Sequence, residues 1–291
     1  MKTLLLIAVL SLGILFPYGY EYTFLIRYFL MAMLFFSFLD VRFNREIINK
    51  IHFVILFATI AVAILVFLLL KQINLDLAQA AFITAIAPTA IGAPVITSLT
   101  KGKVEFVTFS LLLNNITIAV LIPFLVTLLM QNHFDISVGK ILLPVLITIS
   151  IPFVLAQLLK FGLPNVWKKL VEWKEISFYV WMLNIYVASS DASYYINSEL
   201  LGRLGIVFQI AFVSLVLCGL FFTLGLLIGG KNYSAESKQA MGQKNNAFSI
   251  WIALTFMNPI SVLGPIFYVF TQNIYISGLL YKTHQTQKGM E

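Results

Sequence analysis

The sequence contains few of the side chains that most enzymes use. Of its 291 residues 11% are charged, and there is one cysteine and there are three histidines. A single cysteine, Cys218, excludes an internal disulfide. His52, His133 and His284 are expected at or beyond helix ends, where they cannot form a serine–histidine pair or a His-Glu-x-x-His zinc motif inside the protein. We therefore expect no enzymatic activity, no catalytic residue, no metal and no cofactor.

Long polar segments are also missing. The chain is 60% hydrophobic with a mean hydropathy of +0.95, which is typical of an all-α polytopic membrane protein. About 20 apolar residues span the roughly 30 Å of a bilayer core, so the length leaves no room for a separate soluble domain. The net charge of +7 could suggest nucleic acid, but basic residues in a membrane protein gather in cytoplasmic loops. Nucleic-acid binding is therefore not expected, and the expected surroundings are the lipid bilayer.

Hydrophobic runs predict ten membrane-spanning helices. The predicted ranges are 3–17, 23–40, 52–70, 76–98, 104–130, 139–160, 176–191, 203–229, 237–257 and 262–281. The first run begins like a secretory signal, but no Ala-x-Ala cleavage site follows Pro17, so we interpret it as a retained helix. An even number of helices places both termini on the same side of the membrane.

The basic residues favour one orientation. If both termini are cytoplasmic, fourteen of the nineteen lysines and arginines lie on the cytoplasmic side. Only Arg27, Lys71, Lys140 and Arg203 then lie near outer helix ends, and Lys244 lies within a helix. This asymmetry predicts a multi-pass protein of the cell inner membrane with both termini in the cytoplasm.

A polar segment at residues 163–175 separates the sixth and seventh predicted helices. It is too polar to span a membrane and combines aromatic residues with lysines, so it is predicted to lie along the cytoplasmic membrane surface. Residues 1–162 are then expected to hold the first five-helix repeat and the sixth helix. Residues 176–291 are expected to hold the remaining helices of the second repeat.

Two predicted helices contain residues that interrupt a helix. The fourth contains Pro88, Gly92 and Pro94, and the ninth contains Gly242 followed by the polar residues 243–246. Each is the fourth helix of its half, and interrupted helices at matching positions indicate an inverted-repeat transporter, because broken backbone is tolerated only away from lipid. We therefore predict two inverted five-helix repeats with crossed discontinuous helices 4 and 9. Helix N-termini at such a crossing suit an anion.

Lys244 is the basic residue that cannot be assigned to a membrane surface. An ionisable group at bilayer depth costs about 2.5 to 3.5 kcal/mol on insertion scales and usually faces a cavity, a partner or a substrate path. Its ammonium could be a fixed internal cation, a direct partner of an anionic substrate, or a proton carrier. A lysine that extends to the surface is the alternative without a function.

Three motifs, in this order and spacing, resemble the bile acid:sodium symporter family over essentially the whole chain. The first is the break from Pro88 to Thr97 with the following Leu-Thr-Lys-Gly-Lys at 99–103. The second is Gly-Gln-Lys-Asn-Asn-Ala at 242–247, and the third is Gly-Pro-Ile-Phe-Tyr at 264–268 with Gln-Asn-Ile at 272–274. The chain is similar to a bacterial member of this family with degenerate sodium sites.

The resemblance implies a panel of helices 1, 2, 6 and 7 and a core of helices 3–5 and 8–10. It also implies elevator-like alternating access and small or amphipathic organic anions as substrates. Asn245 matches the asparagine of the family, and Asn273 aligns with a polar position. The residues expected to bind substrate are Thr89, Ile91, Lys244, Asn245, Asn246 and Asn273.

The sodium sites of the family are not matched by this sequence. By the resemblance, a Ser-Asn pair falls on Ala93 and Pro94, two hydroxyl positions fall on Val107 and Leu111, and the only carboxylate falls on Ala240. A sodium-liganding glutamine falls on Lys244, whose ammonium could supply the charge of the missing ion. The sequence therefore predicts an organic-anion carrier without the sodium coupling of the family.

Other functions remain as alternatives. A sodium-coupled organic-anion symporter would keep the coupling of the family. A cation/proton antiporter has a related fold but usually places an aspartate at the crossing, whereas Asp76 and Glu105 here lie near helix ends. A proton is a possible coupling partner if Lys244 titrates. A receptor that does not transport is disfavoured because the chain has no soluble output domain.

Overall fold

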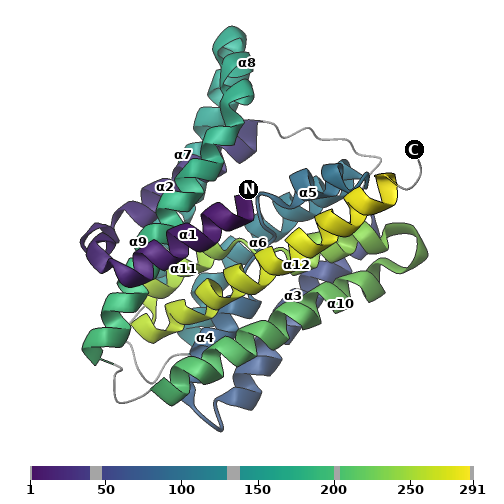
Figure 1. The fold of residues 1–291 in the computed structure, drawn as a ribbon. Coiled ribbons are helices and arrows are strands. Elements are labelled where there is room, and N and C mark those ends of the chain that lie inside the picture. The colour runs from purple at the N-terminus through teal and green to yellow at the C-terminus, as the bar shows by residue number, and fades with distance from the viewer. Residues whose placement is uncertain (1, 40–47, 130–137, 200–203, 289–291) are drawn as a thin grey trace.

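The computed structural model describes residues 2–39, 48–129, 138–199 and 204–288, and the regular elements in these ranges are helices (Figure 1). The elements are α1 (Lys2–Leu15), η1 (Pro17–Tyr22), α2 (Leu25–Leu39), α3 (Lys50–Leu70), α4 (Leu75–Ala85), α5 (Ala93–Leu99), α6 (Val104–Leu129), α7 (Val138–Gly162), α8 (Pro164–Glu172), η3 (Trp173–Glu175), α9 (Ile176–Glu199), α10 (Leu204–Gly242), α11 (Asn246–Phe256), η4 (Pro259–Val262) and α12 (Leu263–Lys288). Arg42, Arg45, His133 and Arg203 lie outside the described residues.

Several helices have the length and composition of membrane spans. Within the described ranges, five stretches are long and apolar enough to cross a bilayer: Lys50–Leu70, Val104–Leu129, Val138–Gly162, Leu204–Gly242 and Pro259–Tyr281. Three shorter apolar helices, α2, α4 and α11, accompany them. The protein is therefore a helical polytopic membrane protein. Each of the ten predicted ranges contains a helix, but the number of crossings and the inverted repeats stay predictions.

The helices pack in two sets. In one set, α9 packs against α1, η1 and α2, and α2 also packs against α7. In the other set, α10 packs against α3, α4, α6 and α12, and α5 packs against α6. The sets meet where α7 contacts α6 and where α2 and α9 contact α11 (Figure 1). We call these the α2–α7–α9 set and the α4–α6–α10 set below.

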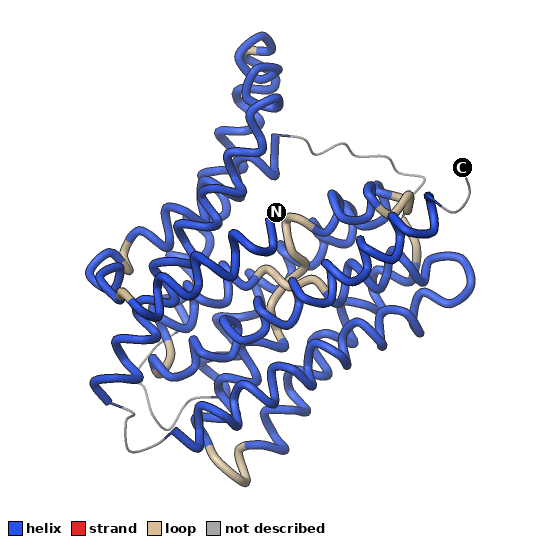
Figure 2. The backbone as a smooth tube through the Cα atoms, viewed as in Figure 1, coloured by secondary structure: helices blue, strands red, loops and turns tan. Residues whose placement is uncertain are grey.

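Both predicted interruptions are present in the structure. Residues 86–92 separate α4 from α5, and residues 243–245 separate α10 from α11. Figure 2 shows these loops in tan within the surrounding helices. Pro88 cannot donate a helical hydrogen bond, and Pro94 takes one of the first positions of α5, where a missing N–H costs nothing.

The helix α10 reverses direction near Gly230. Gly230 has φ 55° and ψ −146°, a backbone conformation that favours glycine, and Tyr233 is also not helical. The two arms then pack closely, since a Cβ on Gly225 would lie 2.6 Å from the Ser237 carbonyl oxygen. Small residues allow this close approach of backbones in membrane helices. The turn lies between the predicted eighth and ninth helices.

The helix α8 and η3 occupy the predicted interfacial segment. Figure 1 shows α7 and α8 extending beyond the other helices at one end of the molecule. The Trp167 indole donates a hydrogen bond to the Leu39 carbonyl at 2.9 Å, which attaches α8 to the end of α2. The position of α8 at the membrane surface stays a prediction.

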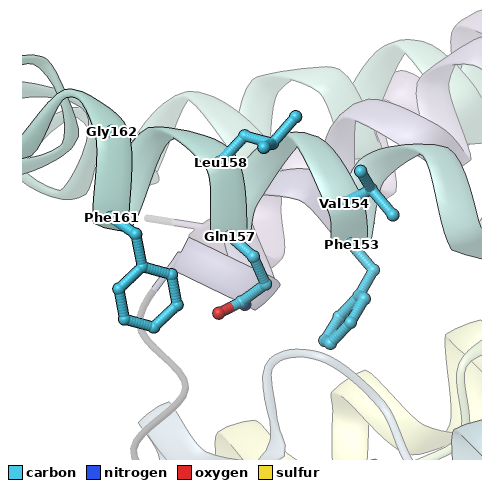
Figure 3. Close-up of a pocket in the computed structure, with 6 residues that line it drawn as sticks. All are labelled: Phe153, Val154, Gln157, Leu158, Phe161 and Gly162. Carbon is cyan, nitrogen blue, oxygen red and sulfur yellow. The ribbon is translucent and has the colours of Figure 1, made fainter.

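An apolar groove of about 460 Å³ lies along the second half of α7. Its lining residues are Phe153, Val154, Gln157, Leu158, Phe161 and Gly162. Figure 3 shows the side chains of Phe153, Gln157 and Phe161 on the same side of the helix. The groove contains none of the residues predicted to bind substrate.

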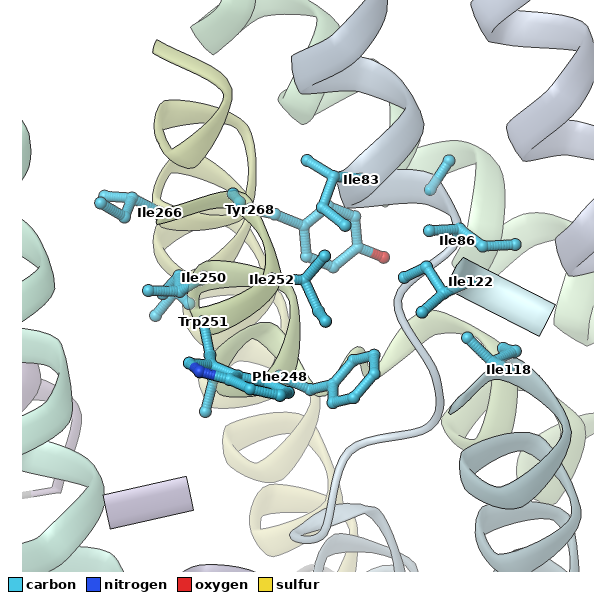
Figure 4. Close-up of a cluster of buried hydrophobic side chains, with 14 of the residues drawn as sticks. Ile83, Ile86, Ile118, Ile122, Phe248, Ile250, Trp251, Ile252, Ile266 and Tyr268 are labelled. Atoms are coloured by element: carbon cyan, nitrogen blue, oxygen red, sulfur yellow. The ribbon is translucent and has the colours of Figure 1, made fainter. Parts of the chain in front are cut away.

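The interior beside the two breaks is filled with branched and aromatic side chains. Figure 4 shows isoleucines of α4, α6 and α11 around Tyr268 of α12. Ile83, Ile118, Ile252 and Tyr268 are fully buried. Because lipid is as apolar as these side chains, van der Waals packing and buried hydrogen bonds hold such helices together. This packing encloses the polar residues of the two breaks.

Candidate functional site

The two interrupted helices are joined by their backbones. Thr89 and Lys244 form an antiparallel β-bridge, in which the Ala90 N–H donates to the Gln243 carbonyl at 2.8 Å. The Asn245 N–H donates to the Pro88 carbonyl at 2.7 Å. Backbone groups freed by the breaks are thus paired with each other, as a low-dielectric interior requires. We call residues 88–90 and 243–245 the crossing.

The side chain of Lys244 is enclosed in the protein. Lys244 is 3% exposed, and its Nζ donates to the Ala85 carbonyl at 3.0 Å. The same Nζ lies 3.7 Å from the centroid of the Phe221 ring. No carboxylate of a described residue lies within ion-pair distance. The side chain therefore does not extend to a surface.

The position of the Lys244 ammonium has an electrostatic reason. Ala85 is the last residue of α4, and the last carbonyls of a helix have no partner within the helix. These carbonyls carry the negative end of the helix dipole, so a lysine there is favourable. The Phe221 ring adds a cation–π contact. Lys244 thus occupies the kind of position at which transporters with broken helices coordinate a cation.

Two asparagines of α6, Asn114 and Asn115, brace the first break. The Asn114 amide donates to the Thr89 hydroxyl at 2.7 Å, and the Asn115 amide donates to the Thr89 carbonyl at 2.9 Å. Thr89 in turn donates to the Ala240 carbonyl at 2.6 Å. Asn115 also accepts from the Asn245 amide at 3.3 Å. Thr89 is therefore fixed between α6 and α10.

The second break is held from α12. The Lys244 N–H donates to the Gln272 side-chain oxygen at 2.8 Å, and the Asn246 amide donates to the same oxygen at 3.5 Å. Asn245 caps α11, since its side-chain oxygen accepts from the Phe248 N–H at 3.3 Å. Asn246 Oδ1 is buried and has no hydrogen-bond partner among the described residues. The N-terminus of α11 therefore retains one unpaired polar atom.

Tyr268 and Gly242 fix the end of α10. The Tyr268 hydroxyl donates to the Gly242 carbonyl at 2.8 Å. A Cβ on Gly242 would overlap the Phe222 ring, so this close approach requires glycine. The Phe222 ring stacks on Tyr275 at 4.0 Å. These contacts explain why Gly242 and Tyr268 belong to the motifs at the crossing.

The positions expected to have lost sodium ligands lie close to the crossing. Ala93, Val107, Leu111 and Ala240 are buried, and Pro94 is partly buried. None of these side chains carries an oxygen atom. Three of their backbone carbonyls accept hydrogen bonds from side chains: Ala240 from Thr89, Leu111 from Asn115, and Ala93 from Thr97. The described residues contain no group of three or more His, Cys, Asp or Glu side chains that could hold a metal ion.

The structure brings together most, but not all, residues predicted to bind substrate. Thr89, Lys244, Asn245 and Asn246 meet at the crossing, where each is at most 6% exposed. Ile91 is partly buried and follows the crossing toward Gly92, which is exposed. The side chains at the crossing are therefore inaccessible to solvent in this conformation. Exposure of the chain increases from Ile91 to Gly92.

Asn273 does not reach the crossing. Its amide donates to the Val269 carbonyl of its own helix at 2.8 Å, whereas the adjacent Gln272 contacts Lys244 and Asn246. Neighbouring helix positions point about 100° apart, so only one of the two can face the break. The sequence named both amides but could not fix the rotation of α12. No pattern in the sequence indicated that Ala85 and Phe221 contact Lys244.

The geometry described above is that of two discontinuous helices joined at a buried polar crossing. The family model of the SBF-like CPA transporter family, which is bile acid:sodium symporter-like, matches residues 5–258. The chain belongs to this family. The resemblance found in the sequence is thus confirmed. A search of curated proteins found no match. Membership in the SBF-like CPA transporter family makes the protein a membrane transporter and argues against an enzyme.

Proposed function

We propose that this SBF-like CPA transporter is a secondary carrier of a small or amphipathic organic anion that works without sodium coupling. In this proposal Lys244 supplies the charge of the missing cation. The carrier lies in the cell inner membrane with both termini in the cytoplasm. Elevator-like movement of a core against a panel provides alternating access.

The observation that carries the proposal is the environment of the Lys244 ammonium. It contacts the carbonyl at the end of α4 and the Phe221 ring, and both contacts come from the protein itself. A sodium ion needs several oxygen ligands, and the side chains at positions 93, 107, 111 and 240 offer none. A fixed ammonium provides one positive charge at the crossing in every conformation, so no ion gradient is needed to fill the site.

The packing of the helices supports the proposed movement. In this proposal the panel is the set formed by α1, α2, α7 and α9, and the core is the set formed by α3–α6 and α10–α12, which pack as two groups. The crossing lies within the second set, where it is held by α6 and α12. A core that moves as a unit would carry the crossing and Lys244 with it.

Two other transport functions are alternatives. Sodium-coupled anion symport would need sodium ligands outside the positions discussed above. The name of the family includes CPA transporters, so exchange of a cation for protons is the second alternative, with Lys244 as the proton carrier. The contacts of Lys244 with Ala85 and Phe221 favour a fixed charge instead. A receptor that does not transport is the least favoured function.

Proteoliposomes test transport against a receptor function. Purified protein is first mixed with pyruvate, pantoate, cholate and taurocholate, and an anion that raises the melting temperature is taken forward. Vesicles preloaded with that anion are then given a labelled trace outside. We expect labelled anion to accumulate by counterflow. An anion that stabilises the protein but shows no counterflow would instead identify a receptor.

A further inference from the structure

Arg27 is a second basic residue whose charged group contacts helices other than its own. It is the third residue of α2 and is partly buried. Its Nε donates to the Thr148 hydroxyl at 2.9 Å, and Thr148 is fully buried near the middle of α7. The sequence places Arg27 near an outer helix end, and in the structure it lies in the first turn of α2 with its side chain bonded to α7.

The guanidinium lies where the two sets of helices meet. Its Cζ is 5.9 Å from the ring centroid of Trp251 in α11, whereas Arg27 and Thr148 belong to the α2–α7–α9 set. Trp251 follows Asn246 by five residues, about 7.5 Å along the helix axis. Arg27 therefore faces the helix that begins directly after the crossing.

The terminal amino groups of Arg27 form no hydrogen bond with a described residue. Apart from the Nε bond to Thr148 and the Trp251 contact, Arg27 has no interaction with a described residue. No described carboxylate lies within ion-pair distance of it. A guanidinium presents its N–H groups as a planar fork that matches a carboxylate or sulfonate. An arginine enclosed by membrane helices usually faces a partner or a substrate path.

A second polar side chain contacts the backbone of Ile26, the residue before Arg27. The Asn184 amide of α9 donates to the Ile26 carbonyl at 3.3 Å, and Asn184 is fully buried. Its Oδ1 has no hydrogen-bond partner among the described residues. The packing of α2 against α7, α9 and α11 thus includes donors and an acceptor that have no partner among the described residues, and these suit a polar ligand.

Lys244 and Arg27 differ in what they can still bind. The Lys244 ammonium already contacts Ala85 and Phe221 and is 3% exposed. We propose that Arg27, and not Lys244, binds the anionic group of the transported substrate, and that Trp251 packs against the apolar part beside it. This inference rests on the proposed anion transport. The substrate it implies carries a carboxylate or sulfonate next to an apolar body.

Thermal stabilisation of arginine variants in nanodiscs tests the inference. The probes are pyruvate, pantoate, cholate and taurocholate, titrated onto wild type, Arg27→Gln, Arg27→Lys and the control Lys140→Gln. Lys140 is exposed on α7, so its variant removes one positive charge away from the contact. We expect an anion that stabilises wild type and Lys140→Gln to bind Arg27→Gln roughly 10- to 100-fold more weakly, as for a lost charged hydrogen bond. Arg27→Lys is expected to retain part of the binding.

The outcomes separate the inference from the proposed function. Equal binding of an anion to wild type and Arg27→Gln overturns the role of Arg27 but leaves anion transport standing. If none of the four anions stabilises the wild type, the proposed function is contradicted and the inference falls with it.

A chemical measurement on the wild type covers the case in which Arg27→Gln does not fold. Phenylglyoxal reacts with accessible guanidinium groups, and mass spectrometry locates the adduct. We expect Arg27 to react in the free protein and a stabilising anion to suppress the reaction. An unreactive Arg27, or labelling that the anion does not change, overturns the inference.

Discussion

Lys244 and Arg27 both contact helices other than their own, but their surroundings differ: Lys244 is buried and Arg27 is partly buried. The Lys244 ammonium has a carbonyl and an aromatic ring as partners, both supplied by the protein. Arg27 is held by one hydrogen bond at Nε, and its terminal amino groups contact no described residue. A charge whose contacts are filled by the protein stabilises the structure, whereas a charge with open donors is available to a ligand.

The two residues also belong to different sets of helices. Lys244 lies at the crossing, within the α4–α6–α10 set, and Arg27 belongs to the α2–α7–α9 set. In the proposed elevator movement the two charges lie on parts that move relative to each other. The comparison therefore predicts that Lys244 determines stability and that Arg27 determines binding.

The largest effect on stability is expected for Lys244→Met. Methionine retains much of the side-chain length but leaves the Ala85 carbonyl without its charged donor, which should lower the free energy of unfolding by about 1.5 to 3 kcal/mol. The loss of stability is measured as the decrease in melting temperature of Lys244→Met in nanodiscs. The control Lys231→Met removes an exposed lysine of α10, the helix that ends just before the break, and should change stability by less than about 0.5 kcal/mol. Unchanged or increased stability of Lys244→Met would show that the ammonium does not hold the crossing.

A smaller effect is expected for Gln272→Leu, with Asn273→Leu as its neighbour control. Leucine at position 272 leaves the buried Lys244 N–H without an acceptor, at a cost of about 1 to 3 kcal/mol. Leucine at position 273 removes a bond within one helix from a partly buried side chain and should cost less than about 0.5 kcal/mol. Melting curves of both variants measure the difference. Equal losses would contradict the assignment of Gln272 to the crossing.

The smallest effect on stability is expected for Arg27→Gln. The variant loses one hydrogen bond from a partly buried group, so the free energy of unfolding should fall by less than about 1 kcal/mol. Chemical denaturation in detergent measures the free energy of unfolding of Arg27→Gln and of the wild type. A loss as large as that of Lys244→Met would remove the distinction between the two cations and make Arg27 a structural residue.

The broken helices could be predicted from the sequence because proline and glycine residues occur where they are interrupted. Pro88, Pro94 and Gly242 disfavour a continuous helix, and the structure contains breaks beside all three. The burial of Lys244 followed from its position within an apolar segment. These predictions depend on where a residue lies along the chain, which a sequence records directly.

The contacts between helices were harder to predict. The choice between Gln272 and Asn273 depends on the rotation of α12, and a helix surrounded by apolar groups has little periodicity to fix that rotation. Arg27 lies near the start of α2, and only the packing of α2 against α7 brings its flexible side chain to Thr148. The partners of Lys244, a backbone carbonyl and a phenylalanine, have no distinctive sequence pattern.

The central claim is that the Lys244 ammonium replaces a coupling ion, and sodium dependence of uptake tests it most directly. Proteoliposomes containing the wild type would be given a stabilising anion with an inward sodium gradient or with N-methyl-D-glucamine in place of sodium. We predict equal uptake rates under both conditions. Lys244→Gln should lose stability or transport and should not become sodium-dependent, because positions 93, 94 and 240 still lack ligands. Strict sodium dependence of wild-type uptake would contradict the claim.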